Sequence, residues 1–307
     1  MSESIGFIGL GAMGQRMARH LLDHGFGLEL FNPSPQAMAP LLQRGARRHA
    51  TPREVADAAE IVLVCVPTPE IVEQVVLGEH GVILGQRVRI LVDHSTTGPT
   101  VARRLEQVLK ARGIASLDAP LAGGVAGAEA GTLSVMAAGD AAAYARCQPV
   151  FAAYGRKVVH LGETAGLGQT LKLVNNMIVS ATLVATSEAL LFGIKVGLDA
   201  GQMLDILNAS TARSYTSESI LAGTVLPRDF NFGFRLDLMR KDIRLFLTEA
   251  EAAGVPAITS AVVKQFFDQA INTGEPTRDM SHVVEVLEGL AGVKIECVPD
   301  GATVLPN

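Results

Sequence analysis

The chain has 307 residues, of which 48% are apolar and 19% charged, and it contains no Trp. This length predicts about two domains, with cores built mainly from Ala, Val, Leu and Ile. The formal net charge of −5 gives no electrostatic reason to expect nucleic acid or an anionic membrane as a partner. The three cysteines and seven histidines show no metal-ligand spacing, and the widely separated cysteines fit a reducing compartment.

The N-terminus lacks the basic region and cleavage site of a secretory signal. The longest uncharged part of the central apolar segment, residues 173–187, is shorter than the roughly 20 residues needed to span a bilayer. We therefore expect a soluble cytoplasmic protein.

The first motif is a glycine-rich turn between an expected strand, 5–8, and an expected helix, 15–24. The turn has the pattern G-x-G-x-x-G, which in a strand-turn-helix context permits a tight turn, close approach of a pyrophosphate and close packing of the helix on the strand. The alternative is an ordinary glycine-rich turn in an α/β sheet. The predicted cofactor-binding residues are Gly9, Leu10, Gly11, Ala12, Met13 and Gly14.

The second strand, 28–31, ends at Asn32, where an NAD-specific fold would place an acid on the ribose 2′-hydroxyl. Asn32 and Ser34 are potential donors to a 2′-phosphate, whereas Pro33 stands where an arginine would help. The choice between NAD and NADP stays open, with a slight preference for NADP. Alternatively, residues 32–35 only turn the chain and cap the next helix.

Alternating strand and helix patterns continue to residue 161 and predict a parallel, doubly wound sheet, the Rossmann arrangement of an α/β protein. Ligands of such sheets bind beyond the carboxyl ends of the strands. The expected strands are 61–66, 88–92, 114–117, 132–137 and 157–161, and the expected helices are 69–77, 99–112 and 140–154.

The sequence Asp118-Ala-Pro-Leu-Ala-Gly-Gly follows one of these strands. Gly123 and Gly124 would leave backbone amides open to an anion such as a carboxylate. A simple turn before the next strand explains the same residues equally well. His94, which also follows a strand, is expected to be hydrogen-bonded, because no constellation around it supports a hydrolase.

A long apolar helix is expected from Leu167 to Gly197, about 46 Å at 1.5 Å per residue. We expect it to join two halves of the chain with most of its circumference buried. Lys172 and Asn176, four residues apart, share one face near its start. The helix dipole would favour a neutral Lys172 amine able to exchange protons. The alternatives are a solvated lysine and a buried structural asparagine.

Helices without intervening strands follow, at 199–208, 216–222, 235–253, 256–273 and 280–290. The expected organisation is a dinucleotide-binding domain at 1–164, an interdomain helix at 165–197, an all-helical substrate or dimerisation domain at 198–292 and a loosely packed tail at 293–307. Lys241 lies in a segment, Met239-Arg-Lys-Asp, whose simpler interpretation is a charged surface.

Four stretches together resemble the β-hydroxyacid dehydrogenases, a family that includes 3-hydroxyisobutyrate dehydrogenase and tartronate semialdehyde reductase. They are 6–14, 118–124, Gly166-Leu-Gly with Lys172 and Asn176, and 239–242. The resemblance covers about residues 4 to 291. It implies a Rossmann domain, a helical domain with a 6-phosphogluconate-dehydrogenase-like architecture, and an active site in the cleft between them.

The resemblance also implies roles for individual residues. Lys172 would be the general acid/base and Asn176 its support in the interconversion of a small 3-hydroxy acid and its semialdehyde. Gly123 and Gly124 would hold the substrate carboxylate, and Lys241 would reach the nicotinamide end of NAD or NADP. Val66, Pro67, Ile71 and Thr96 would line the cofactor.

The chain departs from the family at two places. The usual serine of the carboxylate motif is Ala122, and residues 32–34 match neither the acidic NAD pattern nor the Asn-Arg-Thr pattern of NADP relatives. An imine or other carbonyl reductase and a non-catalytic NADP-binding protein are the alternative functions. Lys172 favours the hydroxy-acid class, because imine reductases of this fold typically lack it. The nearly uncharged long helix suggests a homodimer or homotetramer.

Overall fold

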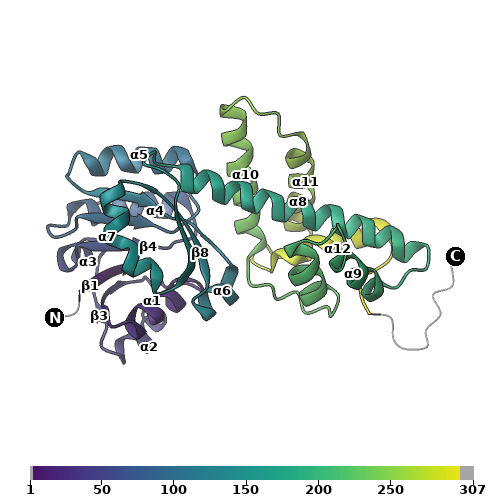
Figure 1. Ribbon diagram of the computed structural model, residues 1–307, viewed down its shortest axis with the longest axis horizontal. Coiled ribbons are helices and arrows are strands. Elements are labelled where there is room, and N and C mark those ends of the chain that lie inside the picture. The colour runs from purple at the N-terminus through teal and green to yellow at the C-terminus, as the bar shows by residue number, and fades with distance from the viewer. Residues whose placement is uncertain (1–2, 298–307) are drawn as a thin grey trace. The chain divides into compact units, whose positions relative to one another are not determined.

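The computed structural model describes residues 3–297 (Figure 1). The chain divides into two compact units, with the boundary between Leu173 and Val174. The first unit alternates strands and helices, and the second is helical.

The strands all belong to the first unit. They are β1 (Ser4–Ile8), β2 (Gly27–Phe31), β3 (Arg47–Arg48), β4 (Ile61–Val64), β5 (Ile90–Asp93), β6 (Ala115–Asp118), β7 (Leu121–Ala122), β8 (Leu133–Gly139) and β9 (Gly155–His160).

The helices of the first unit are α1 (Gly14–Asp23), η1 (Pro35–Ala37), α2 (Ala39–Leu42), α3 (Pro52–Ala58), α4 (Pro69–Leu77), η2 (Val82–Leu84), α5 (Pro99–Lys110), α6 (Gly124–Ala130) and α7 (Ala141–Ala152). The boundary between the units lies within α8 (Leu167–Lys195). The second unit continues with α9 (Ala200–Asn208), η3 (Thr216–Val225), α10 (Leu236–Ala252), α11 (Ile258–Thr273), η4 (Met280–His282) and α12 (Val283–Ala291).

The sheet has the order β3-β2-β1-β4-β5-β6-β8-β7, with β9 also paired to β8. Pairing is parallel from β3 to β6, as expected for a doubly wound fold. One strand departs from the expected parallel arrangement, because β8 runs antiparallel to both β6 and β7. Residues 119–132 form β7 and the short α6, so no helix crosses the sheet to bring β8 back in the parallel sense.

The sheet separates two apolar cores. In β1, Phe7 belongs to one core and Ile8 to the other, and in β4 Leu63 and Val64 alternate in the same way. The first core also contains residues of α1 and α7, and the second contains residues of α3, α4 and α5. Fully buried parallel strands of this kind need apolar side chains on both faces, which explains the continuous apolar runs in the sequence.

Side chains set several helix starts. Thr51 accepts a hydrogen bond from the Glu54 amide, and Thr68 accepts one from the Ile71 amide. A proline at the first helical position follows each of these threonines, where its missing N–H costs nothing. Asp140 caps α7 through the Ala143 amide in the same way.

The second unit has its own apolar core, in which Leu183 and Leu190 of α8 pack with residues of α9 to α12. The expected helix at 216–222 is instead a π-type helix, η3, that extends to Val225. Ile295 is fully buried, and its amide donates to Glu288 over 2.8 Å. Ile295 is therefore packed more closely than the loose tail expected at 293–307, and residues 298–307 lie outside the described residues.

Helix α8 is long and apolar enough, by length and composition alone, to cross a membrane, with a mean hydropathy of 1.8 over its best window. From its uncharged part, residues 173–187, it was expected to be too short to span a bilayer. It is a core helix, because its apolar residues enter the second unit's core and Ser180 and Ser187 are buried with hydrogen bonds to its own backbone. Within the single chain this helix is only partly covered, since Ile178 is 58% exposed and Phe192 71%.

Candidate active site

The three glycines of the first turn meet different surroundings. A Cβ added to Gly9, whose φ is +96°, would lie 2.3 Å from the Cys65 carbonyl oxygen, and one added to Gly14 would lie 2.0 Å from the Gly9 oxygen. A Cβ on Gly11 would meet nothing within 4 Å. Gly9 and Gly14 are thus required by the packing of the protein itself, and Gly11 keeps space open beside the turn.

Helix α1 begins at Gly14 with no side-chain cap and no acidic residue in its first turn. The Gln15 and Arg16 amides donate to the carbonyls of Gly11 and Met13, and the helix dipole makes this end attractive to anions. An uncapped helix start beside the open space at Gly11 fits the pyrophosphate of a dinucleotide. The residues present therefore suit the cofactor that the motif indicates.

Asn32 is hydrogen-bonded to the glycine turn. Its Oδ1 accepts a hydrogen bond from the Leu10 amide over 2.9 Å, and its Nδ2 donates to the Ser34 carbonyl over 3.0 Å. The Ser34 hydroxyl donates to Gln36 over 2.9 Å. The Asn32 amide and the Ser34 hydroxyl, the two expected donors to a 2′-phosphate, therefore both donate hydrogen bonds within the loop after β2.

The residues expected to line the cofactor follow β4 and β5. A Cβ on Gly9 would lie 2.8 Å from Cγ1 of Val66, so Val66 borders the glycine turn. The Val66 amide donates to the Ser95 hydroxyl over 2.9 Å, which joins the loops after the two strands. Pro67 and Thr96 lie in these loops, and Ile71 lies in the first turn of α4.

The carboxylate motif is a strand and a helix start rather than a plain turn. Ala122 pairs with Ser134 of β8, and α6 begins at Gly124. Gly123 and Gly124 have φ values of +122° and +62°, which favour glycine. Glu129 of α6 forms ion pairs with Arg16 and Arg19 of α1, so α6 is tied to the helix that follows the glycine turn.

The start of α8 is held by a carboxylate from β6. Asp118 Oδ1 accepts from the Gly166 amide over 2.8 Å, and Oδ2 accepts from the Gln169 amide over 2.9 Å. A Cβ on Gly168 would lie 2.2 Å from the Met136 carbonyl oxygen, and one on Gly166 would lie 2.8 Å from Pro99. These glycines allow close approach of the protein to itself.

Gln169 is fully buried and connects the same helix start to the loop after β5 by hydrogen bonds. Its Oε1 accepts from the amides of Thr97 and Gly98 over 2.9 and 3.2 Å, and its Nε2 donates to the Ser95 carbonyl over 2.9 Å. Lys172 follows three residues later, in the second turn of α8 and half-buried. Gln169 was not among the predicted site residues, although a glutamine between Gly168 and Lys172 was a visible signal.

Buried titratable groups surround these strand ends. His94 bonds through its two ring nitrogens to the Ala119 carbonyl, at 2.6 Å, and the Tyr154 hydroxyl, at 2.8 Å, which matches the expected structural role. Burial lowers the pKa of His94 to about 4. Asp93 is also buried, and burial raises its pKa to about 7. Asp93 was missed in the sequence, although it immediately precedes His94.

In the second unit, Asn176 is buried, and its Nδ2 donates to Asp242 Oδ2 over 2.6 Å. The other carboxylate oxygen of Asp242 forms an ion pair with Lys241 Nζ at 2.7 Å. Lys241 is therefore part of a largely buried polar cluster and not of a solvated charged face. Asp242 stood beside Lys241 in the quoted motif but was not predicted as a site residue.

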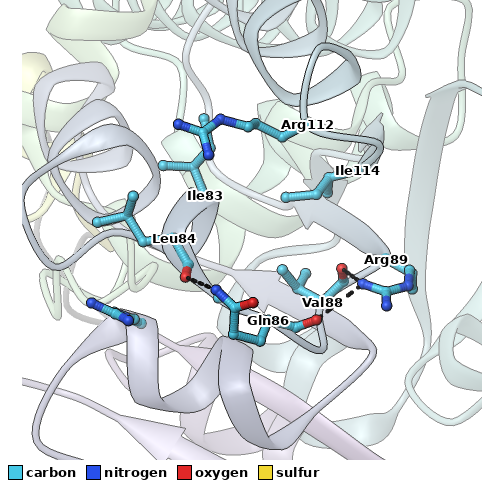
Figure 2. Close-up of a pocket in the computed structure, with 9 residues that line it drawn as sticks. Ile83, Leu84, Gln86, Val88, Arg89, Arg112 and Ile114 are labelled. Atoms are coloured by element: carbon cyan, nitrogen blue, oxygen red, sulfur yellow. Dashed lines mark hydrogen bonds between the residues drawn. The ribbon is translucent and has the colours of Figure 1, made fainter.

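A pocket of about 350 Å³ lies elsewhere in the first unit (Figure 2). Apart from Arg53 of α3, its residues precede β5 and β6, whereas ligands of open α/β sheets bind at the opposite, carboxyl ends of the strands. Figure 2 shows Arg89 bonded to the carbonyls of Gln86 and Val88. None of the predicted site residues lines this pocket, and no metal-binding group of three His, Cys, Asp or Glu occurs among residues 3–297.

Comparison with known proteins decides the family. Residues 4–162 match the NAD binding domain of 6-phosphogluconate dehydrogenase, and residues 166–287 match the NAD-binding region of NADP-dependent 3-hydroxyisobutyrate dehydrogenase. The 2-(hydroxymethyl)glutarate dehydrogenase of Eubacterium barkeri is 35% identical over 96% of this chain and 98% of its own length. The chain belongs to the β-hydroxyacid dehydrogenase family.

Other relatives of this β-hydroxyacid dehydrogenase agree. The 3-hydroxyisobutyrate dehydrogenase of Pseudomonas aeruginosa is 33% identical over 86% of this chain and 90% of its own. A solved structure of Mycobacterium tuberculosis 3-hydroxyisobutyrate dehydrogenase with L-serine has a TM-score of 0.83 at 29% identity and covers 94% of this chain and 99% of its own.

These findings confirm three expectations from the sequence. The fold is a Rossmann-type domain with a helical C-terminal domain, the protein is an NAD(P)-dependent hydroxyacid dehydrogenase, and its cofactor is NAD or NADP.

The glycine turn of this β-hydroxyacid dehydrogenase yields a test. Gly11→Ala should leave the thermal unfolding temperature unchanged, because its Cβ meets no protein atom. It should weaken NADH and NADPH binding by about tenfold or more, because the methyl group enters the space that the pyrophosphate needs. Fluorescence titration and thermal unfolding measure the two effects.

Two further glycines serve as controls. Gly289→Ala, also without a protein atom within 4 Å but in α12, should bind cofactor normally. Gly14→Ala should lower the unfolding temperature, because its Cβ overlaps the Gly9 carbonyl. Cofactor binding to Gly11→Ala equal to that of the wild type would show that the turn does not contact the pyrophosphate.

Proposed function

We propose that the enzyme interconverts a 2-substituted 3-hydroxypropanoate and its semialdehyde. The relatives act on, or were crystallised with, 2-(hydroxymethyl)glutarate, 3-hydroxyisobutyrate and L-serine. Each compound has a carboxylate and a hydroxymethyl group on the same carbon and differs in the remaining substituent. The shared part defines the reacting group, and the substituent of the substrate of this chain stays undetermined.

One observation carries the proposed mechanism. Lys172 lies in the second turn of α8, and the first turn of that helix is tied to the carboxyl ends of β5 and β6 by Asp118 and Gln169. The carboxyl ends of parallel strands are where open α/β sheets bind their ligands. A lysine amine held at this edge is suited to exchange a proton with a substrate oxygen.

The proposed roles follow from the chemistry of each group. In oxidation, Lys172 Nζ accepts the proton of the substrate hydroxyl, and in reduction it returns the proton to the carbonyl oxygen. Asn176, one turn later on the same helix, supports this arrangement. The nicotinamide cofactor, when bound, supplies hydride transfer, so the protein has to align the substrate and move one proton.

The substrate carboxylate is proposed to bind at the carboxylate motif. The Gly123 and Gly124 amides at the start of α6 are the donors, and Ala122 borders them. Lys241, which is paired with Asp242, is assigned to the nicotinamide end of the cofactor. Val66, Pro67, Ile71 and Thr96 are assigned to the ribose and ring.

Removing the lysine tests the mechanism. Lys172→Ala should lower kcat by about 100-fold or more, within the range for loss of a general acid/base, with NADH and NADPH affinity retained. Absorbance at the reduced-nicotinamide band, with NAD and NADP separately and a panel of 2-substituted 3-hydroxypropanoates, measures turnover. Lys195→Ala, an exposed lysine at the other end of α8, is the matched control.

Near-normal turnover of folded Lys172→Ala would remove the lysine from the mechanism. If the wild type binds cofactor but no hydroxy acid or semialdehyde reacts, imines and larger carbonyl compounds become the next substrates to assay. The absence of turnover with any of them would favour a cofactor-binding role.

The carboxylate pocket yields a second test. Ala122→Ser restores a hydroxyl donor beside the proposed carboxylate position, so the KM of short carboxylate substrates should fall by about tenfold, the effect of one hydrogen bond to a charged group. Steady-state kinetics measure it, with Ala126→Ser on exposed α6 surface as the control. An unchanged or higher KM would indicate that the pocket holds a different group.

We also propose a cytoplasmic homodimer or homotetramer without nucleic acid or membrane partners. The exposed apolar side chains of α8, such as Ile178 and Phe192, support the self-association. Light scattering should give at least twice the monomer mass of 32.3 kDa. A monomer at assay concentration would contradict the proposal.

A further inference from the structure

Two buried carboxylates face each other across neighbouring strands. Asp93 of β5 and Asp118 of β6 are register partners in a parallel pair, and each is the last residue of its strand. Partners in such a pair lie about 5 Å apart and project to the same face of the sheet. Both side chains are at most 5% exposed. Two adjacent buried negative charges are costly, so the pair favours holding one proton.

The hydrogen-bond partners distinguish the two carboxyls. Both oxygens of Asp118 accept from backbone amides, which cannot accept a proton in return. Asp93 Oδ1 accepts from the Ser95 amide, and its Oδ2 accepts from the Thr97 hydroxyl over 3.3 Å, a group that can instead accept from a protonated carboxyl. A hydroxyl either donates or accepts. The proton is therefore accommodated on Asp93, and the charge on Asp118.

The other titratable groups at this edge are neutral near pH 7. Burial raises the pKa of the Cys65 thiol to about 12 and raises that of Tyr154, and it lowers that of His94 to about 4. Burial raises the pKa of Asp93 to about 7 and that of Asp118 to about 6, with the charge of Asp118 also raising the former. Among these groups the carboxyl pair therefore carries the charge.

An ionised Asp118 replaces a missing helix cap. The residue before α8 is Gly166, which has no side chain to accept the amide of Gln169, the third residue of the helix. Asp118 accepts that amide from a different strand and places a negative charge at the positive end of the helix dipole. Lys172 follows Gln169 by three residues, about 4.5 Å along the helix axis.

We propose that ionised Asp118 is a positioning residue, which fixes the first turn of α8 and thereby Lys172, and that Asp93 keeps it ionised by holding the proton of the pair. The inference rests on the proposed role of Lys172. Asp118 acts through the helix and its charge and is not assigned to the substrate or the cofactor.

The first experiment follows Lys172 itself, independently of turnover. Competitive acylation at a series of pH values, read by mass spectrometry, gives the pH midpoint of Lys172 labelling in the full-length protein. Asp118→Asn should move this midpoint to lower pH by about half a unit or more, because a negative charge that favours the ammonium form is removed. The kcat of the same variant should fall about tenfold, with cofactor affinity changed less than threefold.

Asp140→Asn is the matched control, because Asp140 caps α7 in the same unit and asparagine is an equally good cap. It should move neither the labelling midpoint nor kcat. If Asp118 had only a structural role, Asp118→Asn would lower the unfolding temperature but leave the labelling midpoint and the kcat of the folded fraction unchanged. This result would overturn the positioning role.

The second experiment tests where the proton resides. A carboxyl whose pKa is raised on folding stabilises the protein at low pH, and this contribution is lost as pH rises through the folded pKa, about 7 for Asp93. The difference in unfolding temperature, Asp93→Asn minus wild type, should therefore increase by at least about 3 °C between pH 5.5 and pH 8.5. A constant difference would contradict a proton on Asp93.

The two failures are distinguishable. If Lys172→Ala keeps its turnover, the proposed function fails, while the labelling and unfolding experiments still report on the link between Asp118 and Lys172 and on the proton of the pair. If Lys172→Ala is inactive but Asp118→Asn labels and turns over like the wild type, the proposed function stands and the positioning role is wrong.

Discussion

The carboxylate of Asp118 joins the end of a strand to the start of a helix. Its two oxygens accept the amides of Gly166 and Gln169, so α8 begins at a position fixed by β6. Gln169 then binds the loop after β5 through both ends of its own amide. That loop also contains Ser95, whose hydroxyl accepts from the Val66 amide. Hydrogen bonds therefore join the loops after β4 and β5 to the start of α8.

Much of the first unit could be predicted from sequence patterns. The apolar runs gave the strands of the parallel sheet, and the glycine pattern gave the turn into α1, because each depends on local chemistry. The direction of β8 could not be predicted in this way, since it depends on how residues 119–132 are divided between β7 and α6. Buried polar partners were equally inaccessible, because the link from Asp118 to Gln169 spans 51 residues.

Glycines illustrate the same limit. The sequence shows where the glycines occur, and the structure shows what each of them meets. Gly14 and Gly168 lie against the protein's own carbonyl oxygens, and Gly11 alone of these three faces open space. Likewise Asn176 and Lys241 were recognised by family resemblance, whereas their shared partner Asp242 becomes evident only when the second unit is folded. Sequence spacing identified candidate residues, whereas the contacts of their side chains became evident only in the folded structure.

The hydrogen bonds of Asn32 constrain any redesign of coenzyme preference. Its side chain accepts from the Leu10 amide in the glycine turn and donates to the Ser34 carbonyl in the loop after β2. With the cofactor placed at this turn as proposed, a substitution of Asn32 would alter the turn and the loop together, so the two cannot be tuned separately at this position. Evolution or engineering toward one coenzyme has a freer route through Pro33 and the residues that follow it, whose side chains do not brace the glycine turn.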